Sequence, residues 1–137
     1  MFTRFMDMHS HGYAKEPQEY ILIEACEADA KIIFYNRFDH NPNCVTCTCC
    51  GEDYSIQEYD TLREATAYDR GCNSVEIDKT LREWVYVEEA NPEQESWRPY
   101  VTLEDYLLRP SVLVIYDKDI KADDRIGEVP SEGWVWQ

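Results

Sequence analysis

Residues Tyr20–Phe38, YILIEACEADAKIIFYNRF, change their hydrophobic period half-way along and thereby decide the class of fold. The first part, Tyr20–Ala25, is apolar and rich in β-forming residues, which is typical of a buried strand. From Glu27 to Phe38 the apolar residues recur at helical spacing, with acidic residues in the first turn and Arg37 near the last. The pattern predicts a strand followed by a helix. The predicted apolar face of the helix consists of Ala28, Ile32, Tyr35 and Phe38.

Two further helices are predicted from their first residues. Thr61 is followed by Glu64 at the spacing of a capping box, ahead of a short periodic segment. Thr102 has Asp105 at the same spacing, ahead of a second short helix. Pro42 marks the end of the first helix, because the residue before a proline is excluded from the α region.

The remaining apolar segments are interpreted as short strands. Val112–Tyr116, VLVIY, is an unbroken apolar run and is the predicted central strand. Val45–Cys49 and Asp53–Gln57 flank a Cys-Gly turn and are predicted to form the two arms of a hairpin. Phe2–Met8 alternates large apolar residues with polar ones and is a predicted first strand. Ser74–Ala90 fits either two strands or a strand and a helical turn.

The chain has 137 residues, enough for one hydrophobic core, and residues 1–137 are predicted to form a single domain with an acidic tail from about residue 117. Hydrophobic residues make up 44% and aromatic residues 13%, which excludes a disordered chain. About five or six short strands alternate irregularly with about three helices. The predicted class is therefore α+β, with a mixed or antiparallel sheet.

Acidic residues outnumber basic ones by 28 to 13, which gives a net charge of −15 and an isoelectric point near 4.4. This field repels nucleic-acid phosphates and anionic lipids and attracts basic proteins. Carboxylates gathered on one face would imitate the phosphates of DNA, whereas scattered ones would only confer solubility. The residues predicted to contact a partner are Glu52, Asp53, Glu58, Asp60, Glu88, Glu89, Asp123, Asp124, Trp134 and Trp136. The two tryptophans also suit self-association or the core.

No apolar segment reaches membrane-spanning length, and the first residues have no secretory pattern. The protein is therefore expected in the cytosol of the cell that makes it. Thiols are kept reduced there, so the six cysteines favour metal ligation, thiol chemistry or burial over disulfides.

Four of the six cysteines lie within the seven residues Cys44–Cys50, CVTCTCC. Cys47, Cys50 and Gly51 have the CxxCG spacing of a zinc knuckle, in which a tight turn directs two thiolates at one metal. The other predicted zinc ligands are Cys72 and Cys44, with Cys49, His40 and Cys26 as alternatives to Cys44. The competing interpretation is a group of reduced thiols that pack as small apolar side chains.

The three histidines suggest a second kind of metal site. His9 and His11 are two residues apart, so both imidazoles share one side of an extended segment, with Asp7 on that side too. Together with His40 they would hold a hydrolytic metal that activates water at an open coordination position. The chain has no Gly-rich phosphate loop, GxSxG or HExxH motif, which argues against other common classes of enzyme.

Residues 34–56, FYNRFDHNPNCVTCTCCGEDYSI, residues 61–72, TLREATAYDRGC, and the opening FMDMHS resemble a group of small uncharacterised bacteriophage proteins. The resemblance implies a phage origin and the cytosol of a bacterial host, and it implies no particular reaction. Small acidic phage proteins include inhibitors of host defence, such as anti-CRISPR and anti-restriction proteins that mimic DNA, and this is an analogy of class.

These observations favour a non-enzymatic protein that binds and inhibits a basic, nucleic-acid-handling host protein. The expected partner is a nuclease, a CRISPR or restriction effector, or a polymerase, and direct binding to nucleic acid or membrane is not expected. The alternatives are a metal-dependent hydrolase that uses His9, His11 and His40, and a structural or regulatory phage protein without DNA mimicry.

Overall fold

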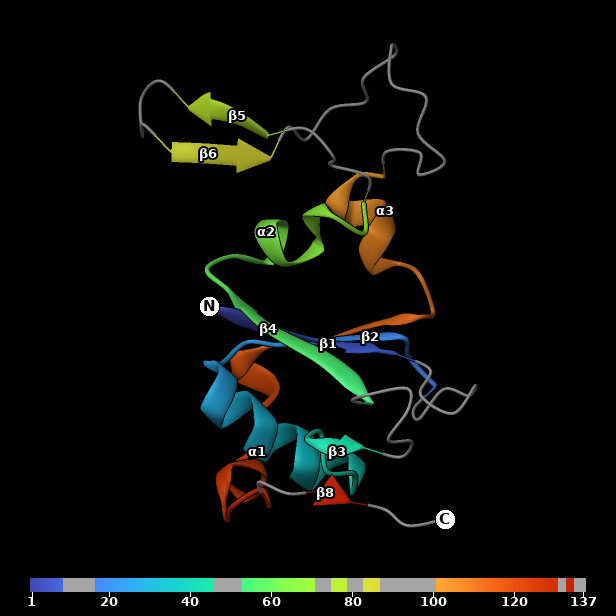
Figure 1. Cartoon of the computed structure of the whole chain (residues 1–137), viewed down its shortest axis with the longest axis vertical. Helices are drawn as coiled ribbons and strands as arrows, with labels where there is room; N and C mark the ends of the chain where they lie inside the picture. The colour runs from blue at the N-terminus through green and yellow to red at the C-terminus, as the bar shows by residue number, and fades with distance from the viewer. Residues whose placement is uncertain are drawn as a thin grey trace.

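The computed structural model describes residues 1–8, 17–45, 53–70, 75–78, 83–86, 101–130 and 133–134 (Figure 1). Residues 44–45, 75–78, 83–86 and 133–134 are described by their backbone. The strands are β1 (Phe2–Asp7), β2 (Tyr20–Ile23), β3 (Cys44–Val45), β4 (Tyr54–Tyr59), β5 (Val75–Asp78), β6 (Glu83–Tyr86), β7 (Val112–Ile115) and β8 (Gly133–Trp134). The helices are α1 (Glu27–Phe38), α2 (Leu62–Ala67) and α3 (Leu103–Leu107), with 3-10 turns η2 (Asp117–Asp119) and η3 (Ala122–Arg125).

A four-stranded mixed sheet in the order β4-β1-β2-β7 forms the middle of the structure. Strand β1 is antiparallel to both of its neighbours, with Phe5 opposite Ile21 on β2 and Ile56 on β4. Strands β2 and β7 run parallel, with Leu22 opposite Val114. The predicted α+β class is confirmed.

Helices cover both faces of this sheet, as Figure 1 shows: α1 with the 3-10 turns lies on one face, and α2 with α3 lies on the other. Successive side chains of a strand point to opposite faces, so each strand contributes to two cores. Ile21 packs in the core under α1, whereas its neighbour Leu22 packs in the core under α2 and α3. Both side chains are fully buried, which explains why β2 is continuously apolar.

An aromatic cluster joins α1 to the sheet. The ring of Phe34 stacks on Phe5 with centroids 4.6 Å apart and meets the ring of Tyr54 edge-on at 5.1 Å. The buried residues of α1 are Ala30, Ile33 and Phe34, so the predicted apolar face was wrong except at Phe38, which packs against this core. Ala28 is exposed, because Ala30, Ile33 and Phe34 form the i, i+3, i+4 stripe that contacts the sheet.

The predicted helix starts are confirmed. Thr61 Oγ1 accepts a hydrogen bond from the Glu64 N–H at 3.2 Å, and Thr102 Oγ1 accepts one from the Asp105 N–H at 3.3 Å. Helix α1 has the predicted bounds and ends at Asp39, whose φ of 50° is left-handed. Asp tolerates this conformation better than most residues, so the helix stops before Pro42 is reached.

One predicted strand position is wrong, and one predicted pairing is not tested. Strand β4 pairs along its whole length with β1, and β3 pairs in parallel with β8, whereas residues 46–49 of the predicted hairpin arm lie outside the described residues. The run VLVIY does form a strand, but β7 lies at the edge of the sheet. Its apolar composition reflects helical layers on both faces rather than strands on both edges.

The segment with two interpretations, 74–90, contains two antiparallel strands, with Ile77 opposite Trp84. Strands β5 and β6 pair only with each other among the described strands. The described part of the acidic tail forms η2 and η3 against α1, where Asn36 Nδ2 donates to the carbonyls of Asp124 at 2.7 Å and Ile126 at 2.9 Å. None of the described helices is long and apolar enough to span a membrane.

Candidate functional site

The predicted zinc knuckle borders the described part of the chain. Cys47, Cys50, Cys72 and the alternative ligand Cys49 lie outside the described residues. Cys44 is described by its backbone and starts β3, opposite Gly133 of β8. The parallel β3–β8 pair therefore brings the tail of the chain, including the backbone of Trp134, beside the first cysteine of the predicted knuckle.

Cys26 lies near the end of β4 that is farther from Asp53. It is the N-cap residue of α1, and the next residue, Glu27, donates its N–H to Glu58 Oε2 at 2.7 Å near the end of β4. The knuckle residues precede the start of β4, and the six-residue strand spans about 17 Å. Cys26 is therefore about one strand length from Asp53, the first described residue after the knuckle.

One of the three predicted catalytic histidines is described, and it meets a carboxylate. His40 Nε2 lies 3.4 Å from Asp53 Oδ2, and its ring meets the ring of Tyr54 edge-on at 5.7 Å. His9 and His11 lie outside the described residues. The structure thus places His40 at the start of β4, close to the point where the chain leaves β1 toward His9.

Two buried carboxylates mark the same end of the sheet. Asp53 is fully buried and Asp7 is 4% exposed. The Met8 N–H donates to the Asp53 carbonyl at 2.9 Å, and Asp7 lies opposite Tyr54 across the β1–β4 ladder. Buried carboxylates with a neighbouring imidazole are suitable metal ligands. Among the described residues, no group of three such side chains is arranged to hold a metal, so the hydrolytic site remains a prediction.

The predicted partner-binding acids are distributed over different environments. Asp53 is buried and does not contribute to an exposed surface. Asp60 is exposed, and Glu58 is exposed while also capping α1 through the Glu27 N–H. Glu52, Glu88, Glu89 and Trp136 lie outside the described residues, and Trp134 is described by its backbone in β8.

Asp123 and Asp124 both lie in η3, but only one faces solvent freely. Asp123 is exposed. Asp124 Oδ2 accepts from the Lys121 N–H at 3.0 Å and from Arg37 Nε at 3.1 Å. The Lys121 N–H and then the Arg37 guanidinium stabilise the charged carboxylate and lower the pKa of Asp124. The Asp124 carboxylate therefore bonds η3 to α1 through Arg37.

A buried polar cluster that the sequence did not indicate lies between the sheet and the α2–α3 layer. Arg4 is 7% exposed, and its Nη1 lies 3.4 Å from Asp69 Oδ2. The Tyr106 hydroxyl lies 3.3 Å from the same oxygen and donates to it. The Arg4 guanidinium also lies over the Tyr59 ring, 5.5 Å from its centroid. Asp69 thereby links β1 to α3.

Arg70 is a second buried arginine in this layer. It is fully buried, its Nε donates to Thr66 Oγ1 at 2.9 Å, and its Nη2 donates to the Arg63 carbonyl at 3.0 Å. The Arg70 carbonyl accepts the Val101 N–H at 2.8 Å, which ties the end of α2 to the start of α3. Arginine is seldom buried, so composition alone gave no signal for these two positions.

Burial of Tyr106 determines how this layer responds to alkaline pH. Removal from water raises the pKa of Tyr106, and the negative charge of Asp69 raises it further. The hydroxyl therefore stays protonated in the folded protein at pH values where an exposed tyrosine ionises. Its role is to donate a structural hydrogen bond rather than to act as a base near neutral pH.

No known protein family, curated protein or solved structure gives a match to this chain. The geometry and charge of the described residues therefore carry the functional argument. The resemblance to small bacteriophage proteins stays a prediction.

Tyr106→Phe should change how stability depends on pH. Loss of the hydrogen bond to Asp69 should cost about 1 kcal/mol near pH 7. Above pH 10.0, the ordinary tyrosine value, the unfolded wild-type chain loses the Tyr106 proton while the folded protein keeps it, so wild-type stability should fall. The variant lacks this loss, so its deficit should shrink between about pH 10 and 11 in urea unfolding.

Tyr68→Phe is the matched control, because Tyr68 is 51% exposed. The deficit of Tyr106→Phe should shrink with pH by more than that of this control. A deficit of Tyr106→Phe that stays constant would contradict the assigned role of burial.

Zinc content should distinguish the two predicted metal sites. Elemental analysis of the purified protein should give one equivalent of zinc that is lost in Cys47→Ser and Cys50→Ser, because each removes a thiolate of the knuckle. Cys26→Ser is the control and should retain the metal. Loss of zinc in His40→Ala with retention in Cys47→Ser would contradict the knuckle and favour the histidine site. A metal-free wild-type protein would leave packed thiols as the interpretation.

Proposed function

We propose that this chain is a non-enzymatic acidic protein that binds a basic, nucleic-acid-handling protein of a bacterial host and blocks it. The observation that carries the proposal is a group of carboxylates at one end of the sheet, in a chain with a net charge of −15. A protein with this charge is attracted over long distances to a positively charged nucleic-acid channel.

The proposed binding surface, here called the acidic end, is formed where three elements meet. Helix α1 begins there, β4 ends there and α2 begins there, at the left of Figure 1. The hydrogen bond from the Glu27 N–H to Glu58 Oε2, 2.7 Å long, joins the first two elements. The exposed or half-exposed carboxylates of the acidic end are Glu27, Asp29, Glu58, Asp60 and Glu64.

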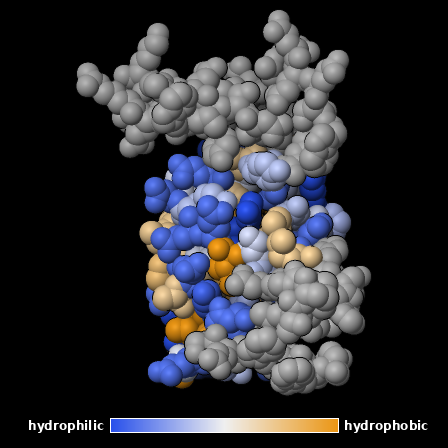
Figure 2. Space-filling model, viewed as in Figure 1, coloured by the Kyte–Doolittle hydropathy of each residue, from blue (hydrophilic) through white to orange (hydrophobic). Residues whose placement is uncertain are grey.

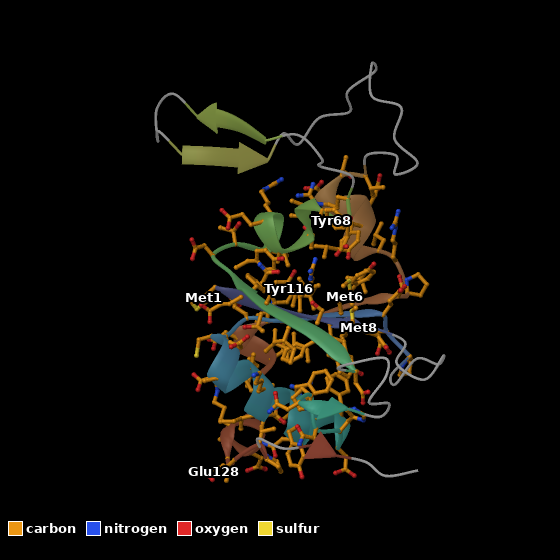
Figure 3. The ribbon with its side chains drawn as sticks, viewed as in Figure 1. Met1, Met6, Met8, Tyr68, Tyr116 and Glu128 are labelled. Atoms are coloured by element: carbon orange, nitrogen blue, oxygen red, sulfur yellow. The ribbon has the colours of Figure 1, made fainter. Side chains whose placement is uncertain are left out.

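An apolar anchor accompanies these charges. Met1 is 50% exposed and lies at the same end, because Phe2 is opposite Tyr59 in the ladder (Figure 3). Interfaces combine a few apolar or aromatic anchors with a polar rim. The described surface is otherwise mostly hydrophilic on the face seen in Figure 2, which supports binding through charge with few apolar contacts.

The 3-10 turns η2 and η3 are less suitable for a basic partner, although they are also rich in acids. Arginines neutralise part of their charge: Arg37 of α1 pairs with Asp124 at 3.1 Å, and Arg125 pairs with Asp117 at 2.7 Å. A basic partner would have to compete with these internal ion pairs. The acidic end is therefore the proposed contact.

Neutralising the acidic end should weaken binding selectively. The triple variant Asp29→Asn, Asp60→Asn, Glu64→Gln removes three exposed carboxylates there. The matched control, Asp39→Asn, Asp123→Asn, Glu128→Gln, removes three exposed carboxylates after the end of α1 and in the tail, where Figure 3 shows Glu128 below Met1. Binding would be measured by competition with duplex DNA for purified restriction nucleases, CRISPR effectors and polymerases.

The triple variant at the acidic end should lose at least about ten-fold in affinity, since each close charge pair at an interface contributes on the order of 1 kcal/mol or more. The control should lose clearly less, because it lowers the net charge equally but leaves the contact intact. Equal losses would contradict a defined binding surface. Absence of binding to every candidate at low salt would contradict the proposed function itself.

A further inference from the structure

The outer edge of β7 carries backbone groups that bond to no other described residue. Strand β7 bonds to β2 through every second residue: the Tyr20 N–H donates to the Ser111 carbonyl at 3.0 Å and the Glu24 N–H donates to the Ile115 carbonyl at 2.9 Å. By the alternation of a strand, Val112, Val114 and Tyr116 direct their backbone groups away from β2. These groups lie along the sheet edge at which no described strand pairs.

Turns within the chain use two of the outward groups. The Val112 N–H donates to the Arg109 carbonyl at 3.1 Å, and the Tyr116 carbonyl accepts the Asp119 N–H at 2.9 Å. The bonds among the described residues leave four groups at this edge: the Val112 carbonyl, both groups of Val114, and the Tyr116 N–H. Donors and acceptors are thus placed symmetrically about Val114.

We propose that the β7 edge pairs antiparallel with the β7 edge of a second copy of this chain, with the two-fold axis at Val114. In this register the two Val114 residues exchange N–H···O=C bonds, and each Tyr116 N–H donates to the Val112 carbonyl of the other copy. All four free groups are then used in each copy. The ladder would also place the Val112 N–H opposite the Tyr116 carbonyl of the other copy, and these two groups are already bonded by the flanking turns.

The side chains of β7 suit the same register. On the α2–α3 face Val114 would meet Val114, and Val112 would meet Tyr116 of the other copy. On the α1 face Leu113 would meet Ile115. These are the β-branched, aliphatic and aromatic pairs that stabilise antiparallel strands. Leu113, Val114 and Tyr116 are only half-buried in the single chain, so the pairing would bury additional apolar surface.

Opposite charges at the two ends of β7 also suit antiparallel pairing of two copies. Arg109 is exposed just before the strand and Asp119 is exposed just after it. Antiparallel pairing brings the residues before one strand close to the residues after the other, so Arg109 of each copy lies near Asp119 of its partner. Two opposite-charge contacts therefore flank the paired strands.

The opposite edge of the sheet does not have these properties. Glu58 and Asp60 are both exposed at the end of β4. Residues 53–60 contain no lysine or arginine, so two antiparallel copies of β4 would gain no opposite-charge contact between these segments. Charge complementarity thus selects the β7 edge for self-pairing.

Self-pairing goes beyond the proposed function, and the dimer affinity should depend on salt with the opposite sign to the affinity for a basic partner. Two copies that each carry a charge of −15 repel each other over long distances, so screening by salt should strengthen their association. Binding of a basic partner should weaken with salt. Failure of one proposal is therefore distinguishable from failure of the other.

Sedimentation velocity of the full chain, over a concentration series at ionic strengths of about 50 mM and 500 mM, tests the proposal. The expected result is a monomer–dimer equilibrium that shifts toward dimer at high salt. Val114→Pro removes the N–H at the two-fold axis in both copies and should raise the dimer Kd about 30-fold. Proline is tolerated at an edge position that donates outward, and circular dichroism checks that the variant folds.

Two further variants test the dimer by changing charge, without a proline in β7. Asp119→Lys and Asp123→Lys change the net charge equally, but only the first places a lysine near Arg109 of the other copy. Asp123→Lys should strengthen the dimer by reducing repulsion, whereas Asp119→Lys should weaken it. A wild-type monomer at all concentrations in high salt would overturn the proposal. Dimers that are unaffected by both Val114→Pro and Asp119→Lys would also overturn it.

Discussion

Strand β1 is bonded on both edges and covered on both faces, and the rest of the described sheet depends on this position. It is antiparallel to β2 on one side and to β4 on the other. Phe5 enters the aromatic cluster with Phe34, while its neighbour Arg4 enters the opposite layer. A strand in this position must satisfy two different environments with alternating side chains.

Burial of the Arg4 guanidinium explains the polar layer beneath α2 and α3. A guanidinium removed from water is costly unless it is paired and hydrogen-bonded. Asp69 supplies the opposite charge, Tyr106 donates to the same carboxylate, and the Tyr59 ring lies under the cation. One buried arginine thus fixes the position of the end of α2 and of α3 relative to the sheet. The α1 face is held differently, by apolar and aromatic packing.

Local patterns in the sequence were sufficient to predict individual helices and strands. They were not sufficient to predict which of these elements contact each other. The bounds of α1 and the caps at Thr61 and Thr102 followed from periodicity and side-chain chemistry over a few residues. The edge position of β7 could not be inferred, because a strand buried on both faces is apolar whether or not its edge is bonded. The Arg4–Asp69 pair joins residues 65 positions apart, and no local pattern reports such a contact. For the same reason the meeting of His40 with Asp53 was not anticipated.

The functional account depends on charge and therefore on ionic strength. The most direct measurement is the affinity of the full chain for a purified bacterial nuclease with a basic DNA channel, taken from about 20 mM to about 300 mM salt. Binding through the acidic end should be tightest at the lowest salt and should weaken steadily as the salt concentration rises. An affinity that is independent of salt, or no binding at low salt across a panel of such nucleases, would contradict it.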